Sequence, residues 1–105
     1  MESKDKILSQ IRTSVFEVLP GSEIILFGSR ARNDANDSSD YDLLIILKSS
    51  IQPDDRLRFQ ALIRKKLAIR NILADIIVQS RSDVELKKNF KGHIVREALK
   101  EGVSV

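Results

Sequence analysis

The chain alternates between stretches whose apolar residues recur at helical spacing and short runs that are apolar throughout. Between residues 4 and 19, Ile7, Ile11 and Val15 return every four positions, which predicts an amphipathic helix that Pro20-Gly21 ends. The remaining pattern predicts strands at about 23–27, 41–47 and 72–79, a loop with a short helix at 28–36, and helices at about 54–69, 83–89 and 91–100, the last closed by Gly102.

This order of elements predicts an α/β or α+β fold in which helices pack on a small mixed sheet. The second and third strands are joined through a helix, which favours a parallel pair whose strands begin at the same edge of the sheet. The sequence does not fix the register of that pair. With 105 residues, of which 42% are apolar and 31% charged, we expect one domain spanning residues 1–105.

Two aspartates stand where the second strand begins. Asp40-Tyr41-Asp42 leads into the apolar run 43–47. Because side chains alternate along a strand, Asp40 and Asp42 should point to one face and Tyr41 to the other, into the core. Two carboxylates at a strand end can share hard cations such as Mg²⁺, whereas without a cation they resist joint ionisation. Taken alone, the pair could equally be a solvated turn.

A Gly-Ser turn ends the first strand, and ten residues separate it from Asp40. Gly28 permits backbone angles that a Cβ hinders, and it lets a ligand approach closely. Ser29 is expected to be the N-cap of the short helix, whose free N–H groups would suit phosphate. A phosphate-binding turn followed by a metal-binding pair indicates a nucleoside triphosphate held with its metal. The turn is not a P-loop, because no Gly-x-x-x-x-Gly-Lys-Ser/Thr is present.

The segment 27–47, FGSRARNDANDSSDYDLLIIL, resembles the nucleotidyltransferase superfamily of DNA polymerase β, and most closely the minimal nucleotidyltransferases of prokaryotes. Their pattern, Gly-Ser, ten residues and Asp-x-Asp, is met without a gap. The family has a third carboxylate on a neighbouring strand, for which Asp75, within ILADIIV, is the candidate. One departure is Asn33, where many relatives have Gly. Asn tolerates the left-handed conformation, so we expect the turn to persist.

The resemblance implies the polymerase β-like palm fold and a reaction. An acceptor hydroxyl would attack the α-phosphorus of ATP or another NTP, and pyrophosphate would leave. Asp40, Asp42 and Asp75 would hold two Mg²⁺ ions, Gly28 and Ser29 would hold the triphosphate, and Asp75 would help to deprotonate the acceptor.

The resemblance also implies a partner. Stand-alone relatives commonly pair with a small helical HEPN-domain toxin, act as its antitoxin and transfer AMP to a toxin tyrosine. Longer relatives carry added domains that bind their acceptors, and 105 residues leave no room for one. We therefore expect the acceptor site to come from a partner protein or from a homo-oligomer.

Several charged residues leave two interpretations open. Arg30 and Arg32 could contact phosphate through their forked guanidinium groups or form surface ion pairs. Asp75, embedded in an apolar strand, could bind metal or pair with an arginine. Asp34 and Asp37 lie in a turn-rich stretch and are expected to be solvated loop residues.

Two other classes of function remain open, a non-catalytic antitoxin that acts by forming a complex with a helical partner and a nucleic-acid binder. A net charge of only +3, with one Tyr, four Phe and no Trp, argues against nucleic acid. The basic run 87–93 ends in the one histidine, His93, and both are interpreted as surface or capping features. The absence of cysteine excludes disulfides, and the lack of a signal peptide or membrane-length apolar run indicates a cytoplasmic protein.

Overall fold

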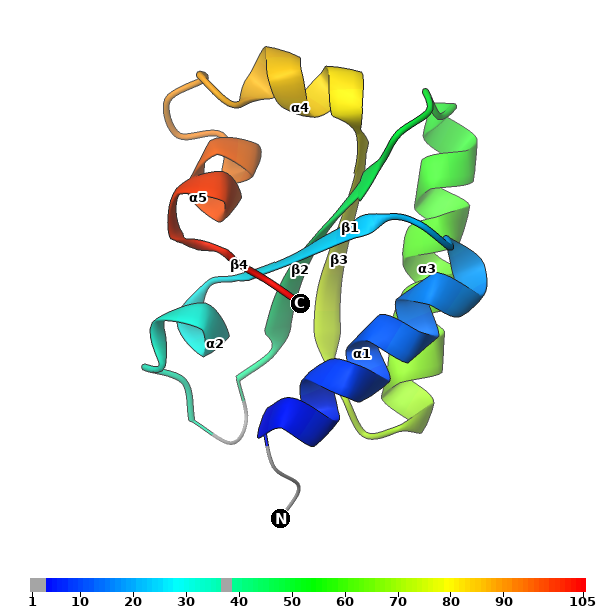
Figure 1. Cartoon of the computed structure of the whole chain (residues 1–105), viewed down its shortest axis with the longest axis vertical. Coiled ribbons are helices and arrows are strands. Elements are labelled where there is room, and N and C mark those ends of the chain that lie inside the picture. Colours follow the sequence, from blue (N-terminus) through cyan, green and yellow to red (C-terminus); the bar gives the residue numbers. More distant parts are fainter. Residues whose placement is uncertain (1–3, 37–38) are drawn as a thin grey trace.

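The computed structural model describes residues 4–36 and 39–105. Each predicted helix and strand is present, and its ends fall within a few residues of the expected positions. Figure 1 shows their arrangement, and in chain order they are α1 (Lys4–Val18), β1 (Glu23–Phe27), α2 (Ser29–Arg32), β2 (Tyr41–Leu47), α3 (Pro53–Ile69), β3 (Ala74–Ser80), α4 (Arg81–Lys87), α5 (Ile94–Glu101) and β4 (Val103–Ser104).

The strands form one mixed sheet in the order β3-β2-β1-β4. β1 runs antiparallel to both β2 and β4, whereas β2 and β3 are parallel, as their helical connection predicted. β4 was not predicted; it is a strand of two residues at the edge of the sheet, where Val103 pairs with Leu26 and Ser104 with Ile25. The predicted fold class, helices packed on a small mixed sheet, is confirmed.

Alternating side chains of the strands divide the core between the two faces of the sheet. Leu43 and Ile45 of β2 point toward α1 and α3, which contribute Ile11, Val15 and Leu67 to that cluster. Burying a side chain of this size contributes about 1.5–3 kcal/mol relative to leaving it exposed, so this face anchors both long helices. Figure 1 shows α1 and α3 beside each other, away from α4 and α5.

The opposite face of the sheet is covered by α4 and α5. Leu44 and Ile46 of β2 pack there with Phe27, Val84 and Val95. Since α4 follows directly from the end of β3, it covers the end of the sheet that lies farthest from the start of that strand. On this face, α2 and the last residues of α5 therefore lie beside the edge where β2 and β3 begin.

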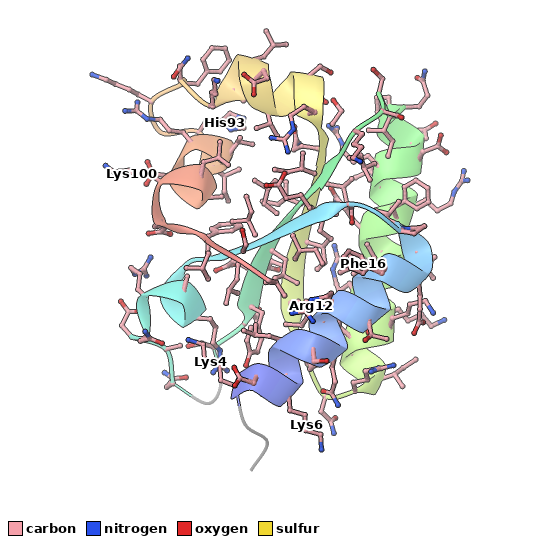
Figure 2. The ribbon with its side chains drawn as sticks, in the orientation of Figure 1. Lys4, Lys6, Arg12, Phe16, His93 and Lys100 are labelled. Atoms are coloured by element: carbon pink, nitrogen blue, oxygen red, sulfur yellow. The ribbon has the colours of Figure 1, made fainter. Side chains whose placement is uncertain are left out.

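Side chains cap the starts of α4 and α5, and a glycine ends α5. The Ser80 hydroxyl accepts a hydrogen bond from the Asp83 N–H, at 3.1 Å, and so begins α4. His93 Nδ1 accepts from the Val95 N–H, at 3.1 Å, which confirms a capping role for the histidine at the start of α5 (Figure 2). Gly102 ends α5 as predicted, since its backbone is extended, with φ −77° and ψ 160°. The position suits glycine because a Cβ there would lie 2.3 Å from both Ala98 O and Ile25 Cγ2.

Across the described ranges, none of the helices combines the length and the apolar character needed to cross a lipid bilayer.

Candidate active site

The parallel register of β2 and β3 brings two predicted site residues together. Asp42 and Asp75 are direct partners across the two strands, each one residue inside its strand. Asp42 shares its face with Leu44 and Ile46, and Asp75 shares its face with Ile77, so both carboxylates point to the side of α4 and α5. Asp42 is half-buried and Asp75 is exposed. The register of β2 and β3, which the sequence left open, thus places Asp75 beside Asp42.

Asp40 and Tyr41 complete the start of β2. Asp40 is exposed and immediately precedes the strand. The Tyr41 N–H donates to Leu73 O at 2.9 Å, and the ring packs against the core on the α1 and α3 face. This confirms the prediction that Tyr41 points away from the aspartates. The Arg30 guanidinium lies 4.5 Å from the centroid of the Tyr41 ring, in a cation–π arrangement.

Gly28 brings the Gly-Ser turn into contact with the acidic cluster. Phe27, which precedes it, pairs with Asp42 across β1 and β2. A Cβ built on Gly28 would lie 2.2 Å from Asp42 Oδ2, so any side chain there would collide with the carboxylate. Gly28 also has φ 75° and ψ −157°, a conformation that only glycine adopts readily. The backbone angles therefore require glycine, and a Cβ would in addition displace the Asp42 carboxylate.

The prediction that Ser29 caps the short helix is wrong. Gly28 occupies the N-cap position of α2, and its carbonyl accepts from the N–H groups of Ala31 and Arg32, at 3.1 Å each. Ser29 is the first helical residue, because the chain leaves the strand in an extended glycine conformation and turns one residue earlier than expected. Asn33 ends α2 in the left-handed region, with φ 62°, so the turn persists without glycine as predicted.

The two arginines of α2 make local contacts. Arg30 donates to Ser39 O from Nε at 3.2 Å and from Nη2 at 2.8 Å. Arg32 forms ion pairs with Asp34, at 3.0 Å, and with Glu101, at 3.1 Å, and these partners raise the pKa of Arg32. Surface pairing, one of the two interpretations, thus describes Arg32 as it stands, and phosphate contact by either arginine stays a prediction.

Two aspartates were predicted to be solvated loop residues. Asp34 is exposed and pairs with Arg32. Asp37 lies outside the described residues.

Glu101 is a site residue that the sequence analysis missed. It is the last residue of α5, and its Oε1 accepts a hydrogen bond from the Gly28 N–H at 3.0 Å, across 73 positions of sequence. The same carboxylate binds the Arg32 guanidinium, with 3.2 Å to Oε1 and 3.1 Å to Oε2. No local pattern marks Glu101, since only the packing of α5 against β1 carries it to the turn.

The site is strongly acidic. The pKa of Asp42 is raised, first by burial and then by the neighbouring charges of Asp75, Asp40 and Glu101, while Arg32 acts in the opposite direction. Within the described part of the chain, Asp75 has no ion pair, so the alternative of a salt bridge to an arginine is not realised there. Asp40 and Asp75 therefore lie near enough to Asp42 for their charges to act on it.

This donor set suits a hard divalent cation in its chemistry, because carboxylate oxygens are the ligands that Mg²⁺ prefers and a cation would relieve their repulsion. The carboxylates are not closed into a cage, however. Among residues 4–36 and 39–105, no three His, Cys, Asp or Glu side chains stand in a ready-made metal-binding arrangement. Any ion would have to draw the side chains of Asp40, Asp42 and Asp75 toward itself.

The fold is thus a small α/β domain in which carboxylates at the start of two parallel strands lie against a glycine turn. The sequence model of the family described as "Nucleotidyltransferase domain" matches residues 8–105. The chain therefore belongs to the nucleotidyltransferase domain family. The comparison with curated proteins finds no match.

Solved structures agree with this assignment. A protein of Sulfolobus solfataricus assigned as a nucleotidyltransferase, determined at 1.40 Å, aligns with a TM-score of 0.56 and 26% identity, over 94% of this chain and 76% of that one. Another similar structure is that of a tri-AMPylated Shewanella oneidensis HEPN toxin in complex with an MNT antitoxin. It aligns with a TM-score of 0.58 and 13% identity, over 97% of this chain and 71% of that one, and at this identity it supports the fold alone.

Proposed function

We propose that this protein transfers a nucleoside monophosphate to an acceptor hydroxyl, and that the nucleotide is AMP taken from ATP. The observation that carries the proposal is the contact between the two motifs. Gly28 lies against the carboxylate of Asp42, and Asp42 is the register partner of Asp75. A triphosphate at the turn would thus lie next to carboxylates that need a cation. Membership of the nucleotidyltransferase family supports transferase chemistry.

Each site residue has a role in this proposal. The N–H groups of the Gly28-Ser29 turn and the Ser29 hydroxyl would bind the triphosphate, with Arg30 and Arg32 as further cationic contacts. Asp40, Asp42 and Asp75 would hold two Mg²⁺ ions, which when bound neutralise charge on the phosphates and on the attacking oxygen.

Bond formation and cleavage occur at one phosphorus atom. The acceptor oxygen forms a bond to the α-phosphorus, the bond from that phosphorus to the oxygen bridging to the β-phosphate breaks, and pyrophosphate leaves. Asp75, which is exposed at the strand edge, would accept the proton of the acceptor hydroxyl. Alignment of the two reactants and charge stabilisation would supply most of the rate.

The acceptor that we propose is a tyrosine of a HEPN-type toxin, which would make this protein the antitoxin of a cytoplasmic pair. Two findings support this choice, the family resemblance of the segment 27–47 and the fold shared with the Shewanella oneidensis complex, whose toxin is AMPylated. The exposed edge beside Asp40 and Asp75 leaves an acceptor room to approach.

Label transfer tests the proposed reaction. The protein with Mg²⁺ and α-labelled ATP, incubated with lysate of its host, should label a macromolecule that γ-labelled ATP does not label. Asp42→Asn should lower the rate at least about 100-fold, the scale of removing one transition-state electrostatic contact. Asp54→Asn, an exposed aspartate in the first turn of α3, serves as the control and should transfer normally. Equal transfer by Asp42→Asn would contradict the proposal.

A non-catalytic antitoxin is the second candidate, and the open arrangement of the carboxylates favours it. In that case the wild-type protein would capture its partner from the lysate without transferring label, and Asp42→Asn would capture it equally well.

A further inference from the structure

The Glu101 carboxylate occupies hydrogen-bond donors that point into the candidate active site. Its Oε1 lies 3.0 Å from the Gly28 nitrogen and 3.2 Å from Arg32 Nη1, and its Oε2 lies 3.1 Å from the same Arg32 nitrogen. A backbone N–H and a guanidinium that converge on one anion form a typical contact for a carboxylate or a phosphate oxygen. In this structure the anion comes from the protein itself.

The carboxylate adds negative charge where the site already has an excess. Asp40, Asp42 and Asp75 gather at the same edge, and Glu101 lies near enough to Asp42 to act on its charge. Neighbouring like charges repel, so a fourth carboxylate is unfavourable there unless local hydrogen-bond donors offset the repulsion. The Gly28 N–H and the Arg32 guanidinium are those donors, which indicates that they favour an anion at this point.

The backbone that carries Glu101 is held firmly, whereas its side chain can move. Gly102 is packed so closely that an added Cβ would lie 2.3 Å from both Ala98 O and Ile25 Cγ2, and the β4 residues that follow pair with β1. The Glu101 side chain is 28% exposed, so water reaches the carboxylate. A change of side-chain rotamer alone would free both donors, and no helix or strand would have to separate.

We propose that Glu101 is an internal competitor for the triphosphate, occupying the anion position in the ligand-free protein and leaving it when nucleotide binds. The inference rests on the proposed function, since it is the triphosphate of that reaction that displaces the carboxylate. Its consequence is regulatory. Nucleotide affinity is held below what the turn could provide, and whatever moves the end of α5 alters that affinity.

Binding of a non-transferable nucleotide tests the competition. The probe is the α,β-methylene analogue of ATP with Mg²⁺, measured by calorimetry on the full chain. Glu101→Ala, which removes the competing anion, should bind about tenfold more tightly than the wild type, and Glu101→Gln should fall between them because it loses the charge but keeps an acceptor. Glu97→Ala, an exposed glutamate of the same helix, is the matched control and should bind as the wild type does.

The outcomes separate this inference from the proposed function. If the wild type binds the analogue and Glu101→Ala binds it equally or more weakly, Glu101 supports the site or ligates the metal, and the competition is overturned while the proposed function stands. If neither protein binds, both are overturned.

A measurement on the wild type covers the case in which Glu101→Ala does not fold. In NMR spectra, the analogue should shift the Gly28 amide and the Glu101 side-chain carboxyl carbon together. A shift of the Gly28 amide with an unchanged carboxyl carbon would overturn the displacement.

Discussion

Single residues decide whether the two motifs form one site, and Gly28 is the clearest case. Gly28→Ala should destabilise the fold by about 1–3 kcal/mol from backbone strain alone, because φ is 75° there. It should also abolish transfer, since the new Cβ would meet Asp42 Oδ2 at 2.2 Å. Urea denaturation and label transfer measure the two effects.

Gly21 offers a matched control for this substitution. It has a φ of 79°, but an added Cβ would find nothing within 4 Å. Gly21→Ala should therefore share the loss of stability and keep transfer. Normal transfer by Gly28→Ala would contradict the contact between turn and carboxylate.

Asp42 gives a prediction for pH dependence. Its pKa is raised above the ordinary value of 3.8, chiefly by burial. A carboxyl whose folded-state pKa is raised binds its proton more tightly in the folded protein, so its favourable contribution is complete below the unfolded pKa and is lost as pH rises through the folded pKa. At pH 7 without metal, the ionised Asp42 should therefore lower stability.

Thermal unfolding in EDTA checks that sign. Asp42→Asn should melt a few degrees above the wild type at pH 7, a small effect because solvent screens a carboxylate that is only half-buried. The difference should shrink as the pH falls through the raised pKa of Asp42, because the wild-type carboxyl then becomes protonated. A wild type that is the more stable protein at pH 7 in EDTA would show that the charges of the cluster do not oppose folding.

At the scale of helices and strands, the docking of α5 and β4 on β1 places Glu101. Gly102→Ala would bring a Cβ within 2.3 Å of both Ala98 O and Ile25 Cγ2. Overpacking of this kind typically lowers stability by about 1–3 kcal/mol. Because φ at Gly102 is −77°, the loss would reflect packing alone and not backbone strain. Urea denaturation measures it, and unchanged stability would mean that this junction is loose.

Sequence reasoning could predict most of the elements because their apolar periods are clear. β4 could not be predicted, because two residues carry no apolar pattern and form a strand only by pairing with β1. The Gly-Ser turn was assigned correctly but its cap was placed one residue late, because the cap depends on the backbone angles of Gly28. Both errors concern features that tertiary contacts fix.

Among the residues of the candidate site, some could likewise be predicted from local sequence, whereas others depend on tertiary contacts. Asp40 and Asp42 follow from their place at a strand start, and Gly28 from its spacing to them. That Asp75 lies beside Asp42 depended on the register of β2 and β3, which no local signal sets. Glu101 depended on a contact between residues 73 positions apart. The sequence therefore predicted all three aspartates and the glycine, whereas the position of Asp75 relative to Asp42 and the presence of Glu101 depend on packing.

For the molecule as a whole, the two faces of the sheet differ in what covers them. One face is closed by α1 and α3 over a continuous apolar core. The other is covered by α4 and α5, with α4 at the end of β3 (Figure 1), and Asp75 near the start of β3 is exposed. Net charge is +3, yet this open edge is acidic. An acidic edge on a chain of positive net charge is consistent with the proposed binding of a cation at this edge.

The central claim is that the Gly28 turn and the three aspartates form one site for a nucleotide and its metal. The most direct test replaces Mg²⁺ by paramagnetic Mn²⁺ with the α,β-methylene analogue of ATP and follows amide broadening by NMR. We predict the strongest broadening at Gly28, Ser29, Asp42 and Asp75, and its loss in Asp42→Asn. Broadening centred elsewhere, such as at Asp54 and Asp55 of α3, or none at saturating analogue, would contradict the claim.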